Sequence, residues 1–310
     1  MICVLAGGVG AARLLAGVVQ VHPAGDVTVI GNVGDDLELH GLHISPDLDT
    51  VTYTVAGAID PDRGWGLAGE TWQAMDALGR YGGPTWFNLG DRDLATHLFR
   101  TRRLAEGATL TEVTAEITRA WELGFRLLPV TDDPLRTTLT VTLDRGATEL
   151  AFQEYFVEHR HEVPITAVRF DGADVAKPGP DVLAAIAAAD RVVIAPSNPI
   201  VSIGPLLAVD GVRAAIEARR ADTVAVSPIV AGAALKGPAD RMLRELGHEP
   251  TVVGIARLYA PLARTLVIDE ADAALAPHVE AAGIECVAAP TIMSSPAAAA
   301  TLARTVLDAA

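Results

Sequence analysis

The opening of the chain constrains its fold more than any other segment. A short apolar run, Met1–Leu5, predicts a buried parallel strand, because a strand covered on both faces is apolar throughout. A glycine loop follows, and Ala11–Val19 then has the pattern of a helix. This order directs backbone N–H groups and the positive helix end at a phosphate, although close packing of helix on strand also selects glycine. The candidate nucleotide-binding residues in this loop are Gly7, Gly8 and Gly10.

Strand-like and helical patterns alternate over the later part of the chain. They predict a Rossmann-like α/β fold, a mostly parallel sheet with helices on both faces. The strands expected from continuous apolar runs are Arg191–Ala195, Thr223–Val226, Val252–Ile255, Thr265–Ile268 and Glu285–Ala288. Three earlier runs alternate in polarity and predict an antiparallel edge or hairpin: Leu127–Val130, Thr138–Leu143 and Leu150–Phe156. No linker or repeat divides the chain, so we expect a single domain over residues 1–310.

A helical insertion is expected at about residues 66–125, where the alternation is interrupted. Three successive helical patterns lie there: Glu70–Tyr81, Asp91–Ala105 and Leu110–Leu123. Thr109 and Glu112 fit a capping box at the start of the third helix. Such an insertion is placed to act as a lid over the site.

Charge and hydropathy narrow the class of protein. The formal net charge of −15 argues against nucleic acid as a partner, since phosphate backbones are bound by clustered Lys and Arg. A single nucleotide remains compatible, because backbone N–H groups, a few Arg and a metal can hold it. No run approaches the roughly 20 apolar residues of a membrane span, and the opening lacks a charged signal-peptide region. We expect a cytoplasmic protein.

The stretch at 31–50, GNVGDDLELHGLHISPDLDT, is the candidate centre of the site. It follows a predicted strand, Val27–Ile30, and carries few positive charges. Its four carboxylates are Asp35, Asp36, Asp47 and Asp49. Carboxylates that close repel one another unless a cation or a basic ligand group lies among them; the alternative is a pair of solvated turns. Extended backbone would aim Asp47 and Asp49 the same way. Asn32, rather than an acid, ends the strand, which argues against a nicotinamide dehydrogenase.

Polar groups elsewhere add candidates for ligand binding. Ser197 and Asn198 follow a buried strand on a proline-stiffened loop, where a nucleotide or a structural turn is expected. As nucleotide-binding segments, this loop and the glycine loop are expected on opposite sides of the central crevice of the sheet. Lys236 is placed either to reach a phosphate or to be solvated. Arg92 lies at a predicted helix start, where a cation is disfavoured, so a ligand contact would explain it. His97 on the same helix fits a structural role better than a catalytic one.

Taken together, seven motifs resemble the 2-phospho-L-lactate transferases of coenzyme F420 biosynthesis, in particular the actinobacterial phosphoenolpyruvate transferase form. The motifs are LAGGVGAARL, GDDLELHGLHISPDLDT, IDPDRGWG, LGDRDLATHLFR, FQEYFV, APSNPIVSIGP and VSPIVAGAALKGPADRML, in order over nearly the whole chain. YvcK-like regulatory proteins share the glycine opening but resemble the chain less at PDLDT and GDRD.

The resemblance implies an activity and its partners. A phosphoenolpyruvyl or 2-phospho-L-lactyl group would pass from a guanosine diphosphate-linked donor to the deazaflavin alcohol Fo, giving dehydro-F420-0 or F420-0 and GMP. It places Asp49 and Arg92 at Fo, and implies Mg²⁺ and a homodimer. Mg²⁺ favours carboxylates together with substrate phosphates, so our ligand candidates are Asp36, Asp47 and Asp49. Asp49 is also the candidate acceptor of the alcohol proton. The rivals are a non-catalytic regulator of the YvcK-like type that binds a nucleotide sugar, and a magnesium-dependent nucleotidyltransferase.

Overall fold

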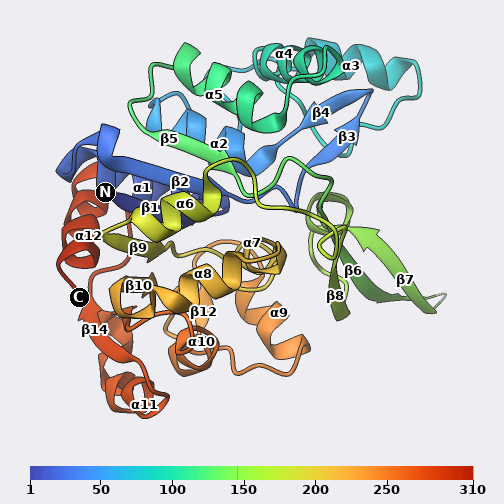
Figure 1. The fold of residues 1–310 in the computed structure, drawn as a ribbon. Helices are drawn as coiled ribbons and strands as arrows, with labels where there is room; N and C mark the ends of the chain where they lie inside the picture. Colours follow the sequence, from blue (N-terminus) through green and yellow to red (C-terminus); the bar gives the residue numbers. More distant parts are fainter. Residues whose placement is uncertain (145, 310) are drawn as a thin grey trace.

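A parallel sheet forms the centre of the molecule in the computed structural model, which describes residues 1–144 and 146–309. Within these residues the sheet has seven strands in the order β14-β13-β10-β9-β1-β2-β5 (Figure 1). Every neighbouring pair is parallel. The strands are β1 (Ile2–Ala6), β2 (Val27–Gly31), β5 (Arg126–Pro129), β9 (Arg191–Ile194), β10 (Thr223–Val226), β13 (Thr265–Asp269) and β14 (Glu285–Ala289). The α/β prediction is confirmed.

The strand order reverses at β1. The chain runs from β1 to β2 and β5 on one side, then returns to β9 and continues to β14 on the other. Because crossovers are right-handed, the two directions of winding put helices on opposite faces. Three helices pack together on one face: α1 (Gly8–Val21), α2 (Pro46–Val55) and α12 (Pro296–Asp308). The later connections carry α6 (Val182–Ala188), α7 (Gly204–Ala208), α8 (Val212–Ala218), α9 (Ala239–Glu245), α10 (Val252–Tyr259) and α11 (Ala276–Ala281).

A second, antiparallel sheet lies beside the central one. Its order is β7-β6-β8, with β6 (Arg136–Leu143), β7 (Gly146–Ala151) and β8 (Ile165–Asp171). It has its own apolar core around Leu139, Val141 and Tyr155. Figure 1 shows it projecting beyond the end of the central sheet. Short paired segments complete the strands: β3 (Leu37–Leu39), β4 (Leu42–Ile44), β11 (Ile229–Val230) and β12 (Ala233–Ala234).

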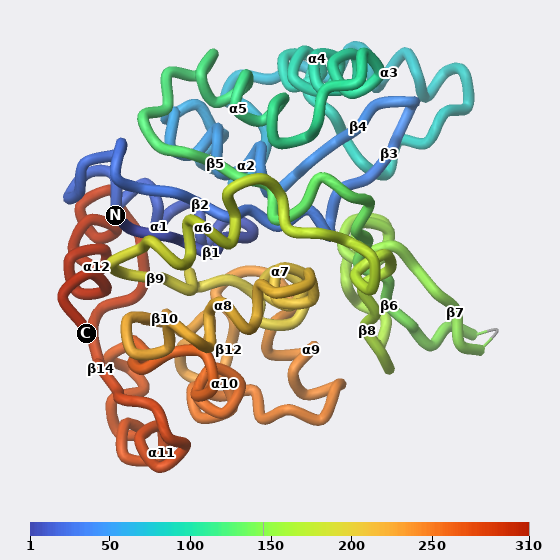
Figure 2. The backbone as a smooth tube through the Cα atoms, viewed as in Figure 1, coloured from blue at the N-terminus to red at the C-terminus, as the bar shows by residue number. Residues whose placement is uncertain are grey.

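The helical insertion lies between β2 and β5. Its helices are α3 (Gln73–Arg80), α4 (Asp93–Ala105) and α5 (Leu110–Ala120), close to the predicted ranges. The capping box of Thr109 and Glu112 is present, as predicted. Figure 2 shows this segment gathered on one side of the chain trace, from β3 to α5. In the described part of the chain, no helix combines the length and the apolar character needed to cross a membrane.

Four local predictions were wrong. Val252–Ile255 is the start of α10 and not a strand, because the Thr251 hydroxyl caps the N–H groups of Val253 and Gly254. Leu127–Val130 lies at the sheet edge as β5, but it pairs with β2 in parallel. The strand expected at Leu150–Phe156 ends at Ala151 and is followed by a π-helix, Glu154–Glu158.

The fourth correction concerns Asp47 and Asp49. Both lie in the first turn of α2, with Pro46 at a first-turn position, so the backbone is helical and not extended. Residues two apart on a helix point about 200° apart, and the two carboxylates therefore face different neighbours.

Candidate functional site

A crevice of about 980 Å³ opens where β1 and β9 end. These neighbouring strands mark the reversal of strand order, which is the position where open α/β sheets bind ligands. One wall comes from the glycine loop, α2 and the insertion, and the other from the segments that follow β7, β9 and β12. All five predicted nucleotide-binding residues line the crevice: Gly7, Gly8, Gly10, Ser197 and Asn198.

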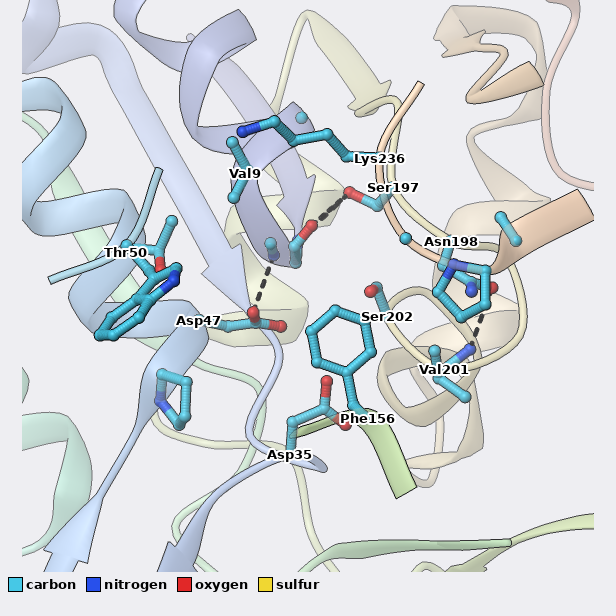
Figure 3. Close-up of a pocket in the computed structure, with 18 of the residues that line it drawn as sticks. Val9, Asp35, Asp47, Thr50, Phe156, Ser197, Asn198, Val201, Ser202 and Lys236 are labelled. Atoms are coloured by element: carbon cyan, nitrogen blue, oxygen red, sulfur yellow. Dashed lines mark hydrogen bonds between the residues drawn. The ribbon is translucent and has the colours of Figure 1, made fainter. Parts of the chain in front are cut away.

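The glycine loop is shorter than expected, because α1 already begins at Gly8. Gly8 has φ +72°, which disfavours a side chain, and its N–H donates to Asp47 Oδ1 at 2.9 Å. A β-carbon on Gly10 would lie 2.3 Å from the Pro196 carbonyl oxygen. The Ser197 hydroxyl donates to the Gly7 carbonyl at 2.7 Å (Figure 3). The two predicted loops therefore touch, instead of facing each other across the crevice.

Asn198 organises its own turn. Its side-chain oxygen accepts from the Ile200 N–H at 2.9 Å, and its amide nitrogen lies 3.3 Å from Met242 Sδ. The sequence interpretations of this loop as a turn and as a ligand site are compatible, since the same residue fixes the loop and lines the crevice.

Asp35 and Asp47 form an acidic patch in the crevice. Burial raises the pKa of Asp47 to about 6, against hydrogen bonds from Asn32 and the Gly8 N–H. Burial also raises the pKa of Asp35, and the Asp47 charge raises it further. Asp35 Oδ1 is buried without a hydrogen-bond partner among the described residues. Two close carboxylates with an unsatisfied oxygen suit a divalent cation.

Asp36 lies behind this patch and is not part of the crevice lining. Its Oδ2 accepts from the Ser45 hydroxyl at 2.7 Å and lies 3.1 Å from His43 Nε2. The magnesium ligation predicted for Asp36, Asp47 and Asp49 is untested, but the three carboxylates do not converge on one point in the described structure.

Asp49 is engaged by a buried arginine. Arg100 from α4 is 1% exposed and donates to both Asp49 carboxylate oxygens, one of them at 3.1 Å. Burial raises the pKa of Asp49, and the Arg100 guanidinium is the largest influence that lowers it. No local sequence pattern signals this pair, because the residues lie 51 positions apart on different helices.

His97 belongs to the same buried network. Its Nδ1 lies 3.3 Å from Arg100 Nη1, and its Nε2 lies 3.2 Å from Asp93. Within the described residues, Asp49, Asp93 and His97 are a cluster compact enough to hold a metal. Arg100 already supplies positive charge there, so the cluster is better explained as an ion-pair network. His97 is structural by the same contacts.

Cations and aromatic rings complete the crevice. Arg13, Arg160 and Lys236 line it without a hydrogen-bonding or ionic partner in the described part of the chain. The aromatic residues of the lining include Trp65, Trp86, Phe87, Phe152 and Phe156. The sequence interpretation did not single out Arg160. It missed Phe152 and Phe156 as lining residues because it assigned Leu150–Phe156 to a strand; Figure 3 shows Phe156 beside Asp35 and Asp47.

Arg92 lies outside the crevice lining. Its side chain is exposed, and its guanidinium donates to the Ala68 carbonyl. The contact between Arg92 and Fo stays a prediction. Among the described residues Ala68 engages only Nη1, so the guanidinium keeps donors that a ligand could use while the bond to Ala68 stays in place.

The fold and site define a doubly wound α/β protein with a crevice at the switch point, lined by cations, carboxylates and aromatic rings. Residues 2–290 match the profile of the 2-phospho-L-lactate transferase CofD family, and the chain belongs to this family.

The relatives are similar over nearly their whole length. The phosphoenolpyruvate transferase of Streptomyces griseus is 47% identical over 309 residues, covering 99% of this chain and 97% of that protein. The phosphoenolpyruvate transferase of Mycolicibacterium smegmatis is 42% identical over 319 residues, covering 99% of this chain and 98% of that protein. A solved upf0052-family protein from Bacillus halodurans superposes with a TM-score of 0.63 at 16% identity, covering 99% of this chain and 98% of that one. This likeness supports the fold and nothing about function.

Proposed function

We propose that the chain moves a phosphoenolpyruvyl, or 2-phospho-L-lactyl, group from a guanosine diphosphate-linked donor to the deazaflavin alcohol Fo. The products are dehydro-F420-0 or F420-0, together with GMP. The observation that carries this proposal is the lining of the crevice. Three cations that have no partner within residues 1–144 and 146–309 lie at the switch point with a helix N-terminus, and aromatic rings from the insertion line the same cavity.

The donor fits the anion-binding part of the crevice. A diphosphate is multiply negative, and backbone N–H groups in the first turn of α1 are oriented towards an anion. The Gly8 N–H already donates to Asp47 Oδ1, so the phosphate oxygens would use the N–H groups that follow it. Arg13 and Arg160 add charge at the lining. Asp35 and Asp47 are the carboxylates that suit Mg²⁺, which when bound would neutralise part of the donor charge.

The acceptor fits the wall formed by the insertion. Trp65 and Trp86 offer ring faces for a flat heterocycle such as the deazaflavin. Asp49 lies at the same wall and can orient a hydroxyl of Fo. Its role as acceptor of the alcohol proton stays a prediction, and its bonds from Arg100 lower its basicity.

The test is to mix pure protein with Fo, a guanosine diphosphate-linked donor and Mg²⁺, and to follow GMP release and the deazaflavin product. Enolpyruvyl, lactyl and glyceryl donors compared side by side would identify the three-carbon acid. Nucleotide binding without GMP release would support the regulator instead, and formation of the donor would support a nucleotidyltransferase.

A further inference from the structure

Lys236 reaches across the crevice from one wall to the other. It lies between β12 and α9, in the later half of the chain. A β-carbon built on Gly64, which belongs to the insertion side, would lie 2.8 Å from Lys236 Nζ and 3.9 Å from Val9 Cγ1. The ammonium group is thus placed beside the first turn of α1, and Figure 3 shows it next to Val9.

Gly64 provides the space for this ammonium group. Gly64 is buried and has φ +75°, a conformation that side chains rarely adopt. A β-carbon there would lie 2.8 Å from Lys236 Nζ, so the flexible end of the lysine would have to shift. Glycine at this position leaves the ammonium group its place beside α1.

No anion neutralises Lys236 within the described residues. Its Nζ makes neither a hydrogen bond nor an ion pair there, whereas the nearby Arg63 pairs with Asp60 at 2.8 Å. Lys236 is exposed, and it lines the crevice together with Arg13 and Arg160, which likewise have no partner among the described residues. Three positive charges therefore gather at this crevice in a chain with 39 acidic residues against 24 Lys and Arg. The ammonium and the positive end of α1 are like charges, and within the described part of the chain Asp47 accepts only the Gly8 N–H at that helix end. An anion between the ammonium and the helix would stabilise both.

The use of lysine here is also informative. Only two of the 24 basic residues are lysines, Lys177 and Lys236. Arginine presents a broad planar fork, whereas lysine presents a compact point charge on a flexible stem. The compact ammonium group lies 2.8 Å from the β-carbon position of Gly64, which a broad planar group would cover more fully.

We propose that Lys236 is a phosphate-binding residue that holds the donor diphosphate against the N-terminus of α1. The inference rests on the proposed function, which supplies the donor. In the transfer, the Fo hydroxyl oxygen bonds to the phosphorus that carries the acid, and the hydroxyl proton is released. The bond from that phosphorus to the bridging oxygen breaks, and this oxygen leaves with GMP and the electron pair. Lys236 stabilises the negative charge that develops on GMP.

Selective acylation tests the contact without turnover. The protein is treated with limiting acetyl N-hydroxysuccinimide ester, with and without GDP and Mg²⁺, and both lysines are quantified by peptide mass spectrometry. GDP should slow acylation of Lys236 about tenfold, in line with occupancy of the site. Lys177 is exposed and outside the crevice, so its acylation should not change.

Matched variants test the energetics. Lys236→Met should weaken GDP binding about tenfold and leave guanosine binding unchanged, and Lys177→Met should change neither. If the unmodified protein releases GMP but Lys236→Met binds GDP as tightly as the unmodified protein does, the inference is overturned and the proposed function stands. Unchanged GDP affinity of Lys236→Met overturns the inference even if GDP slows acylation of Lys236, because GDP would then cover the lysine without being bound by it. Failure of the unmodified protein both to bind GDP and to release GMP overturns both proposals.

Discussion

Removal of Arg100 should destabilise the protein more than any exposed substitution on the same helix. Arg100 is 1% exposed and its partner Asp49 is 5% exposed, so neither charge can be solvated when the other is lost. Breaking a buried pair from one side costs about 3–5 kcal/mol of unfolding free energy. Arg100→Met, which keeps much of the side-chain volume, should lose that amount in urea unfolding. Arg102→Met is the control, because Arg102 is 65% exposed in its side chain and should change stability by roughly 0.5 kcal/mol or less.

A double variant separates the charge from the packing. Asp49→Asn combined with Arg100→Met removes both charges, so it should be about 2 kcal/mol more stable than Arg100→Met alone. If Arg100→Met unfolds at the same urea concentration as Arg102→Met, the buried pair is not a major determinant of stability. If the double variant is no better than the single one, the loss comes from packing.

The same variants should respond differently to pH. Burial raises the pKa of Asp49, and removing Arg100 removes the largest opposing influence, so the folded-state pKa rises further. A buried, charged Asp49 lowers the free energy of unfolding. This loss is absent below the pKa that Asp49 has in the unfolded state, and it grows as pH rises towards the pKa of Asp49 in the folded state. The difference in unfolding free energy between the unmodified protein and Arg100→Met should therefore become smaller as pH falls from about 7 to 5. His97 and Asp93 face the same group, so the double variant serves as the reference and should show no such narrowing.

Three further outcomes are expected. Gly8→Ala should cost about 1–2 kcal/mol because of its φ of +72°, measured against Gly25→Ala, which meets no neighbouring atom and has no positive φ. Asp47→Asn should lower GMP release strongly at an almost unchanged melting temperature. Exhaustive chelation should stop turnover, and full activity after chelation would exclude a requirement for Mg²⁺. Arg92→Ala should weaken Fo binding by about ten- to hundredfold and spare GDP, as fluorescence and calorimetric titrations would show; unchanged Fo affinity contradicts the assignment.

The parts of the fold that the sequence predicts well depend on one-dimensional signals. Strands such as Arg191–Ala195 are covered on both faces and are therefore apolar throughout. The same signal misassigns Val252–Ile255, because a helix buried on most sides is also a continuous apolar run. There the capping hydroxyl of Thr251 was the distinguishing feature.

The candidate site divides in the same way. Gly8 and Ser197 are predictable, because each follows a buried strand and strand ends converge at the switch point. The helix start at Pro46 could also be predicted, since proline followed by acids in a first turn is typical of a helix N-terminus. The pairing of Asp49 with Arg100 could not be predicted, because it depends on how α4 packs over α2 and no local sequence pattern encodes that packing.

The position of β1 has a consequence for the order of folding. β1 is synthesised long before β9, although β9 is one of its two neighbours in the sheet, and Gly7 meets Ser197 across 190 positions of chain. The nascent chain therefore carries a half-paired apolar strand until β9 has been made, and contacts of such sequence separation form slowly. No amino-terminal fragment that stops short of β9 contains both crevice loops. Added nucleotide should thus leave the early phases of refolding unchanged and stabilise only the completed molecule.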